Sequence, residues 1–114
     1  MELQFNTMDN GIRLIKLSGK MDLIGTGKIE TMFTGYCTGE DVRVIVDLSG
    51  VDYLASTGIR LLLSTFKSLS KRCGKMVLID PTPGVKHVLE VAGVPSIIPV
   101  YSQLESAETV LLAK

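Results

Sequence analysis

The chain lacks several features on which common functional sites are built. Its 114 residues include no tryptophan, two cysteines and one histidine, and its 12 basic and 12 acidic residues cancel to a formal net charge of zero. Cys37 and Cys73 belong to no metal-binding or redox spacing, so two reduced thiols are expected. His87 has no second imidazole to join it, so neither a zinc site nor a histidine-based triad is expected, and no metal or other cofactor is predicted.

The charge balance and the hydropathy also limit the partners. Nucleic-acid binding needs a basic face, and polybasic adhesion to a membrane needs clustered cations, so a neutral chain favours neither. No apolar run reaches the roughly 20 residues of a membrane-spanning helix, and residues 1–4 do not resemble the start of a signal peptide. We expect a cytoplasmic protein of one domain, residues 1–114, without nucleic-acid binding or direct membrane insertion.

Hydrophobic periodicity predicts strands that alternate with helices. A hairpin is expected around Asp9-Asn10-Gly11, residues 18–27 read as a glycine-rich loop, and one helix face recurs from Ile29 to Tyr36. The β-branched run 42–49 is typical of a central strand that is buried on both faces. The remaining expected elements are a helix over 59–72 followed by a left-handed Gly74, a strand over 75–80, a helix over 85–92, an edge strand over 96–100 and a last helix opened by a Ser102–Glu105 capping box.

This order predicts an α/β fold with a mixed, mostly parallel sheet, an N-terminal β-hairpin and about four helices. In open α/β sheets, sites tend to lie at the carboxyl ends of the strands. Ser56-Thr57-Gly58 occupies such a position, because it follows the central strand and precedes a strongly apolar helix. These three residues are therefore the first candidates for a site.

Three interpretations of Ser56 are open from the residues alone. It can be the N-cap of the following helix, where a serine oxygen accepts backbone N–H bonds. It can be a phosphoacceptor, because a helix N-terminus tolerates a phosphate and Gly58 would leave the backbone open to another protein's active site. A serine hydrolase is the enzymatic alternative, but the G-x-S-x-G elbow is absent and nothing in the spacing connects His87 to Ser56.

The segment "VRVIVDLSGVDYLASTGIRLLL" resembles the signature of the STAS-domain family of anti-sigma factor antagonists. The matching residues are Asp47-Leu48-Ser49, Tyr53-Leu54 and Ser56-Thr57-Gly58-Ile59. Upstream, Gly19-Lys20-Met21-Asp22 resembles the family's Gly-Glu-Leu-Asp. Two departures stand beside these matches: Ala55 replaces the Asp that precedes the family's phosphoserine, and Gly25-Thr26 replaces its Thr-Ala.

The resemblance implies a regulatory, non-enzymatic protein with helices mainly on one side of its sheet. It implies that the partner is an anti-sigma factor with serine kinase activity, which inactivates the antagonist by phosphorylating Ser56, and that a serine/threonine phosphatase restores it. Release of a sigma factor would then regulate transcription. Arg60, four residues beyond Ser56, could pair with the phosphate or point to solvent. The expected partner-binding residues are Asp22, Ala55, Thr57, Gly58, Ile59 and Arg60.

Two other functions remain as alternatives. The chain could be a STAS adaptor subunit of a transporter or signalling scaffold without a phosphoswitch, which the absence of the family Asp at Ala55 favours. It could also be a small hydrolase that uses Ser56. Asp47 and Ser49 are expected to end the central strand by bonding local backbone, and Tyr53 and Leu54 to pack in the core or at its rim.

Overall fold

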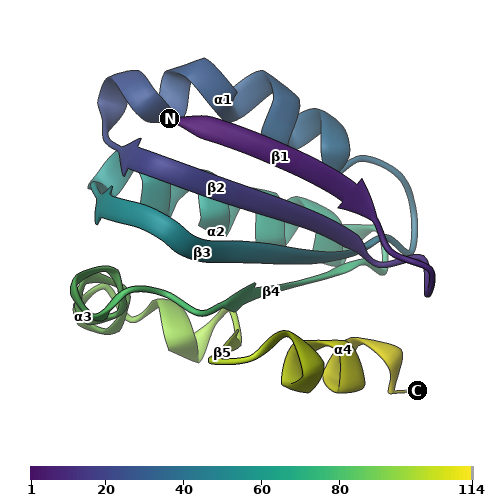
Figure 1. Cartoon of the computed structure of the whole chain (residues 1–114). Helices are drawn as coiled ribbons and strands as arrows, with labels where there is room; N and C mark the ends of the chain where they lie inside the picture. The colour runs from purple at the N-terminus through teal and green to yellow at the C-terminus, as the bar shows by residue number, and fades with distance from the viewer. Residues whose placement is uncertain (114) are drawn as a thin grey trace.

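The computed structural model describes residues 1–113, which form a five-stranded mixed sheet with helices on both faces (Figure 1). The expected α/β fold with four helices and an opening hairpin is confirmed. The strands are β1 (Glu2–Thr7), β2 (Arg13–Met21), β3 (Arg43–Leu54), β4 (Lys75–Ile79) and β5 (Val100–Tyr101). The helices are α1 (Leu23–Tyr36), α2 (Ser56–Lys71), α3 (Pro83–Val91) and α4 (Leu104–Leu112), with a 3₁₀ turn η1 (Val94–Ser96).

The strands lie in the sheet in their chain order, β1-β2-β3-β4-β5. β1 pairs antiparallel with β2, and the other three pairs are parallel. The hairpin turn is built as the sequence predicts: Gly11 has a φ of 85°, and the side-chain oxygen of Asn10 accepts a hydrogen bond from the Ile12 amide at 3.1 Å. Each parallel pair is joined by a helix, as parallel strands require.

Alternate residues of β3 point into two separate cores. Val44 and Val46 lie in the larger core, which α1, α2 and α3 cover, whereas Ile45 lies in a smaller core on the opposite face. There α4 contributes Ala107 and Leu111. Burial of both faces explains why this strand reads as a continuous β-branched run rather than an alternating one.

Several expected boundaries are wrong. Residues 18–27 are not a loop: β2 continues to Met21 and α1 already begins at Leu23. Polar and glycine residues there gave no periodic signal, although tertiary pairing with β3 holds the backbone extended. The central strand runs past residue 49 to Leu54, and the expected edge strand over 96–100 is a 3₁₀ turn followed by the two residues of β5, which does lie at the sheet edge.

The expected helix caps are also corrected. α4 is preceded by Gln103 rather than Ser102, with no side-chain cap bond, so the expected capping box does not form. After α2 the left-handed residue is Cys73, with a φ of 61°, rather than Gly74. Gly74 is instead required for packing, because a Cβ there would lie 2.7 Å from the Val42 carbonyl oxygen.

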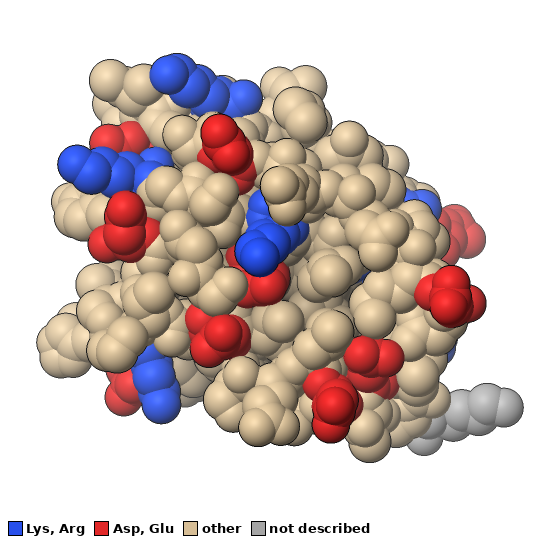
Figure 2. Space-filling model, viewed as in Figure 1, with Lys and Arg blue, Asp and Glu red and all other residues tan. Residues whose placement is uncertain are grey.

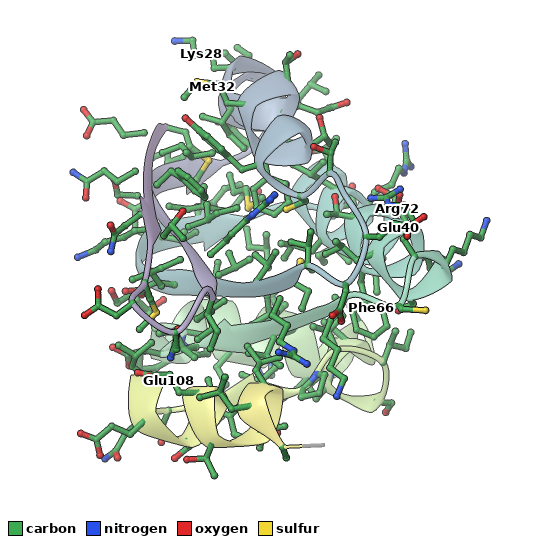
Figure 3. The ribbon with its side chains drawn as sticks, turned by 90° about the vertical axis from the view of Figure 1, so that its right-hand side faces the viewer. Lys28, Met32, Glu40, Phe66, Arg72 and Glu108 are labelled. Carbon is green, nitrogen blue, oxygen red and sulfur yellow. The ribbon has the colours of Figure 1, made fainter. Side chains whose placement is uncertain are left out.

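The two thiols differ in environment and in expected reactivity. Cys37 is buried where α1 ends, and burial raises the pKa of its thiol to about 12 although Arg13 and Arg72 oppose the shift. Arg72, labelled in Figure 3, donates hydrogen bonds to the Cys37 carbonyl at 3.1 Å and to the Gly39 carbonyl at 2.9 Å. Cys73 is exposed. Because the thiolate is the reactive form, only Cys73 should react readily with thiol reagents in the folded protein.

A thiol-labelling experiment checks this expectation. At about pH 8, a disulfide-exchange reagent should modify one thiol in native protein and two in urea, and Cys73→Ser should remove the native reaction. Because the folded pKa of Cys37 lies above its unfolded value, stability should fall as the pH rises from about 9 towards 12. Rapid native labelling of the Cys73→Ser variant would contradict the burial of Cys37.

Candidate functional site at the start of α1 and α2

The carboxyl ends of β2 and β3 bring the first turns of α1 and α2 together. Met21 and Leu54 are register partners, and the Ala55 amide donates a hydrogen bond to the Met21 carbonyl at 3.0 Å. Each helix starts within two residues of this pair, so Asp22 and Ser56 lie at one edge of the sheet. The structure therefore places together two residues that the sequence relates only through the family motif.

The pairing of β2 with β3 has two irregularities before the strands reach this edge. The register shifts between Lys16 and Ser18 and again between Gly19 and Lys20. At the first shift, an Asp47 carboxylate oxygen accepts a hydrogen bond from the Ser49 amide at 2.9 Å. The expected local bond therefore forms, but it stabilises a bulge inside the strand and does not end it.

The carboxyl half of β3 extends beyond its pairing with β4, which ends at Asp47 and Ile79. Beyond that point the Thr82 hydroxyl, just before α3, donates a hydrogen bond to the Val51 carbonyl at 3.2 Å. The Val51 carbonyl, which has no β4 partner, thus accepts a hydrogen bond from a side chain. This bond also connects the start of α3 to the strand that precedes Ser56.

The start of α1 is fixed by one carboxylate and one glycine. Asp22 is the N-cap, and its Oδ1 accepts a hydrogen bond from the Gly25 amide at 2.7 Å. Gly25 is buried, and a Cβ at this position would overlap the Lys20 carbonyl oxygen. In this structure Asp22 therefore caps its own helix, and the glycine lets the first turn pack against the end of β2.

The start of α2 carries no side-chain cap. Ala55 is the N-cap, in extended conformation, and Ser56 is the first helical residue. The expectation that Ser56 is the N-cap is wrong. The first amides of α2 that donate a helical hydrogen bond are those of Gly58 and Ile59, and both donate to the Ala55 carbonyl. The amides of Ser56 and Thr57 come before these and have no acceptor within the helix. The Ser56 side chain is exposed and takes part in none of the hydrogen bonds found within residues 1–113.

Gly58 has a different role from the one expected. It is buried, and a Cβ there would lie 2.7 Å from Met21 Cγ and 2.8 Å from Leu54 Cδ1. The glycine lets α2 approach the ends of β2 and β3, and it does not expose backbone to another protein. Ile59 is half-buried against the large core, whereas Arg60 is exposed.

Large apolar side chains lie exposed at this edge. Leu23 is 72% exposed and Ile24 70%, while Thr26 in the same first turns of α1 is only 3% exposed. Tyr53, at the end of β3, is 52% exposed. We call Leu23, Ile24 and Tyr53 the apolar rim. Exposed apolar side chains beside polar ones are what a protein partner can bury.

Leu23 and Ile24 are not among the site residues predicted from the sequence, because the glycine-rich pattern of residues 18–27 predicts a loop. Once α1 is known to begin at Leu23, the signal is visible: small and polar residues (Gly25, Thr26) occupy its buried face and leucine and isoleucine its exposed face. Such a reversal of the usual pattern is expected where surface residues serve binding rather than folding.

Two threonine hydroxyls between α1 and α2 are buried without a partner. The Oγ1 atoms of Thr26 and Thr57 lack any hydrogen bond, unlike Thr34, which donates to the Glu30 carbonyl one turn earlier. A buried hydroxyl without a partner costs about 1–3 kcal/mol. Both threonines line a groove of about 290 Å³ between the two helices, to which Glu30 and Arg60 also contribute.

No group of three or more histidine, cysteine, aspartate or glutamate side chains that could hold a metal ion occurs within residues 1–113. Across the same residues, no helix has both the length and the apolar character needed to cross a bilayer. On the face shown in Figure 2, acidic and basic side chains are mixed, without a broad basic area. His87 is an exposed residue of α3.

An exposed serine and exposed apolar side chains thus lie at one edge of a small α/β sheet. A family model for the STAS domain matches residues 6–107. BtrV of Bordetella bronchiseptica, named as a candidate anti-sigma factor antagonist, is 32% identical over 103 residues, which cover 89% of each chain. The chain belongs to the STAS domain family, as the sequence motif predicted.

Solved structures share this fold. An anti-sigma factor antagonist (STAS) domain protein from Planctomyces limnophilus matches with a TM-score of 0.87 and 20% identity, over 97% of this chain and 98% of that one. The antagonist SpoIIAA in its unphosphorylated form matches with a TM-score of 0.77 and 20% identity over 96% of each chain. Its phosphorylated form, from Bacillus, gives 0.71 and 19%, over 96% of this chain and 99% of that one.

The uncapped start of α2 allows a direct stability test. Ala55 is in the extended conformation that N-cap residues adopt but has no side-chain oxygen to accept an amide hydrogen. Ala55→Asp should therefore raise the free energy of unfolding by about 1 kcal/mol, measured by urea denaturation. Ala55→Val, which also lacks a cap acceptor, is the matched control and should give no gain. Equal stability of the Asp and Val variants would contradict the described helix start.

Proposed function

We propose that this protein is an anti-sigma factor antagonist that binds an anti-sigma factor with serine kinase activity and is switched off when that kinase phosphorylates Ser56. A serine/threonine phosphatase would reverse the switch. The proposal is supported by family membership, by the names of curated relatives and by the existence of SpoIIAA in both an unphosphorylated and a phosphorylated form. Unphosphorylated protein would hold the anti-sigma factor and so release a sigma factor for transcription.

The observation that carries the proposal is the state of the Ser56 side chain. This side chain is exposed, it makes no capping hydrogen bond, and it lies at the same sheet edge as the apolar rim. A kinase can therefore reach the hydroxyl without unfolding the helix. The same partner could bury Leu23, Ile24 and Tyr53 while it binds, so that recognition and modification share one surface.

The local electrostatics favour a phosphate at this position. The first amides of α2 and the positive end of its dipole face the anion, and Ala55 adds no carboxylate that would repel it. Arg60 is four residues beyond Ser56 and lines the same shallow hollow on α2. Because residues four apart are neighbours on a helix surface, the guanidinium could reach back to the modified serine.

A pull-down followed by a phosphorylation assay tests the proposal. Wild-type protein and Ser56→Asp serve as baits in lysate of the native organism, and mass spectrometry identifies bound proteins. We expect an ATP-binding anti-sigma factor with wild type only, and a gain of one phosphate when the purified pair is incubated with ATP. Ser56→Ala should gain none, whereas Thr57→Ser, the neighbouring control, should still gain one.

The other outcomes separate the remaining interpretations. Phosphate on Ser56→Ala would show that another residue is the acceptor. Recovery of one partner by both baits would favour an adaptor without a phosphoswitch. Reaction of Ser56 with a fluorophosphonate probe would favour a hydrolase.

A further inference from the structure

The groove between the first halves of α1 and α2 contains polar groups that the fold itself does not use. Thr26 is 3% exposed and its Oγ1 has no hydrogen-bond partner. On the opposite helix, the Oγ1 of Thr57 is also buried without a hydrogen-bond partner. Ser64 and Thr34 bond to their own backbone, Ser64 to the Leu61 carbonyl at 3.1 Å, whereas the buried Oγ1 of Thr65 also lacks a partner but lies outside the lining of this groove. Two unused hydroxyls on facing walls point to a polar group that belongs between them.

The charges on the two walls are of opposite sign. Glu30 lines the groove from α1 and Arg60 lines it from α2, while Leu23 and Leu61 supply apolar surface. A simple anion would be repelled by Glu30, and a simple cation by Arg60. A neutral polyol could hydrogen-bond to all of these groups but would balance neither charge. A molecule that carries both an ammonium and a carboxylate would use all four polar groups.

We infer that this groove binds a small zwitterion of the α-amino acid class. The carboxylate lies towards α2, where Arg60 and the Thr57 hydroxyl donate and the helix N-terminus is positive. The ammonium lies towards α1, where the Glu30 carboxylate and the Thr26 oxygen accept. The groove, at about 290 Å³, is far larger than the roughly 30 Å³ of one water molecule, so it has room for such a ligand. This binding does not require phosphorylation of Ser56.

Titration of ¹⁵N-labelled protein with glycine, L-serine and L-leucine tests the inference. At least one should shift the amide signals of Thr26, Gly27, Thr57 and Arg60 in a saturable manner, with a Kd of about 1 mM or tighter. Acetate and methylammonium, which each carry one of the two charges, should bind at least about tenfold more weakly. Glu30→Gln and Arg60→Gln should each weaken binding by at least about tenfold, whereas the exposed controls Glu2→Gln and Lys71→Gln should not.

Thr26→Val distinguishes a ligand-binding hydroxyl from a merely structural one. Replacement of an unpartnered buried hydroxyl by a methyl group of the same shape should keep or raise the melting temperature. The same change should weaken amino-acid binding by at least about fivefold. The inference is overturned if none of the three amino acids gives saturable shifts up to about 20 mM. It is equally overturned if acetate alone binds as well, or if the Glu30 and Arg60 variants bind normally.

Discussion

Phosphoserine introduced at position 56 is expected to weaken binding of the anti-sigma factor by at least about 30-fold. The modification places about two negative charges beside the apolar rim, where Leu23 and Ile24 are exposed. A charge that enters an interface without a counter-charge on the partner typically costs about 2–5 kcal/mol, which corresponds to this loss of affinity. The measurement is a titration calorimetry comparison of modified and unmodified protein against the anti-sigma factor recovered by the pull-down.

Two variants separate this charge effect from a change in the fold. Ser56→Ala should bind within about threefold of wild type, because the exposed hydroxyl makes no hydrogen bond that folding needs. Phosphoserine at Ser70, exposed near the other end of α2, should also leave affinity unchanged. Equal loss of binding from modification at both serines would argue against a specific surface at the start of α2. Normal binding with phosphate on Ser56 would rule out the switch.

Gly25→Ala is expected to destabilise the protein by about 3 kcal/mol or more. The new Cβ would overlap the Lys20 carbonyl oxygen, a backbone atom that cannot rotate away, so the first turn of α1 would have to move from β2. Urea denaturation of wild type and variant measures the change. The Gly25 amide also donates the capping hydrogen bond to the Asp22 carboxylate, so the displaced turn would lose that hydrogen bond as well.

Gly27→Ala provides the matched control, two residues further along the same helix. A Cβ there meets nothing within 4 Å, so only helix propensity should act, with a gain of about 0.5–1 kcal/mol. The two substitutions are chemically identical and should have opposite signs. A loss at both positions, or at neither, would contradict the packing described for the start of α1.

Much of the fold could be predicted because its signals are local. The run 42–49 is rich in valine and isoleucine because β3 is buried on both faces. The turn at Gly11 needs a positive φ, and the residue types of Asp9-Asn10-Gly11 favour such a turn. The long apolar stripe of α2 is visible in the sequence because that helix covers one side of the large core. In each case the cause lies within a few residues of the pattern.

The start of α1 could not be predicted for the opposite reason. Residues 18–27 include the first turn of α1, in which Gly25 and Thr26 are buried while Leu23 and Ile24 are exposed, so the hydrophobic pattern of this turn contradicts its structure. Their conformation is set by pairing with β3 and by close approach to Lys20, both of which are tertiary contacts. The same contacts produce the apolar rim, which is why the sequence analysis missed Leu23 and Ile24.

The sequence by itself determined the order of elements, the family and the position of Ser56 at the junction of the central strand and α2. Only the tertiary structure decided what each residue at that junction does. Ala55, not Ser56, occupies the cap position, and Gly58 lies against Met21 and Leu54 rather than facing solvent. The physical reason is that a motif fixes residue types and spacing, whereas exposure and hydrogen bonding depend on how β2, α1 and α2 pack against one another.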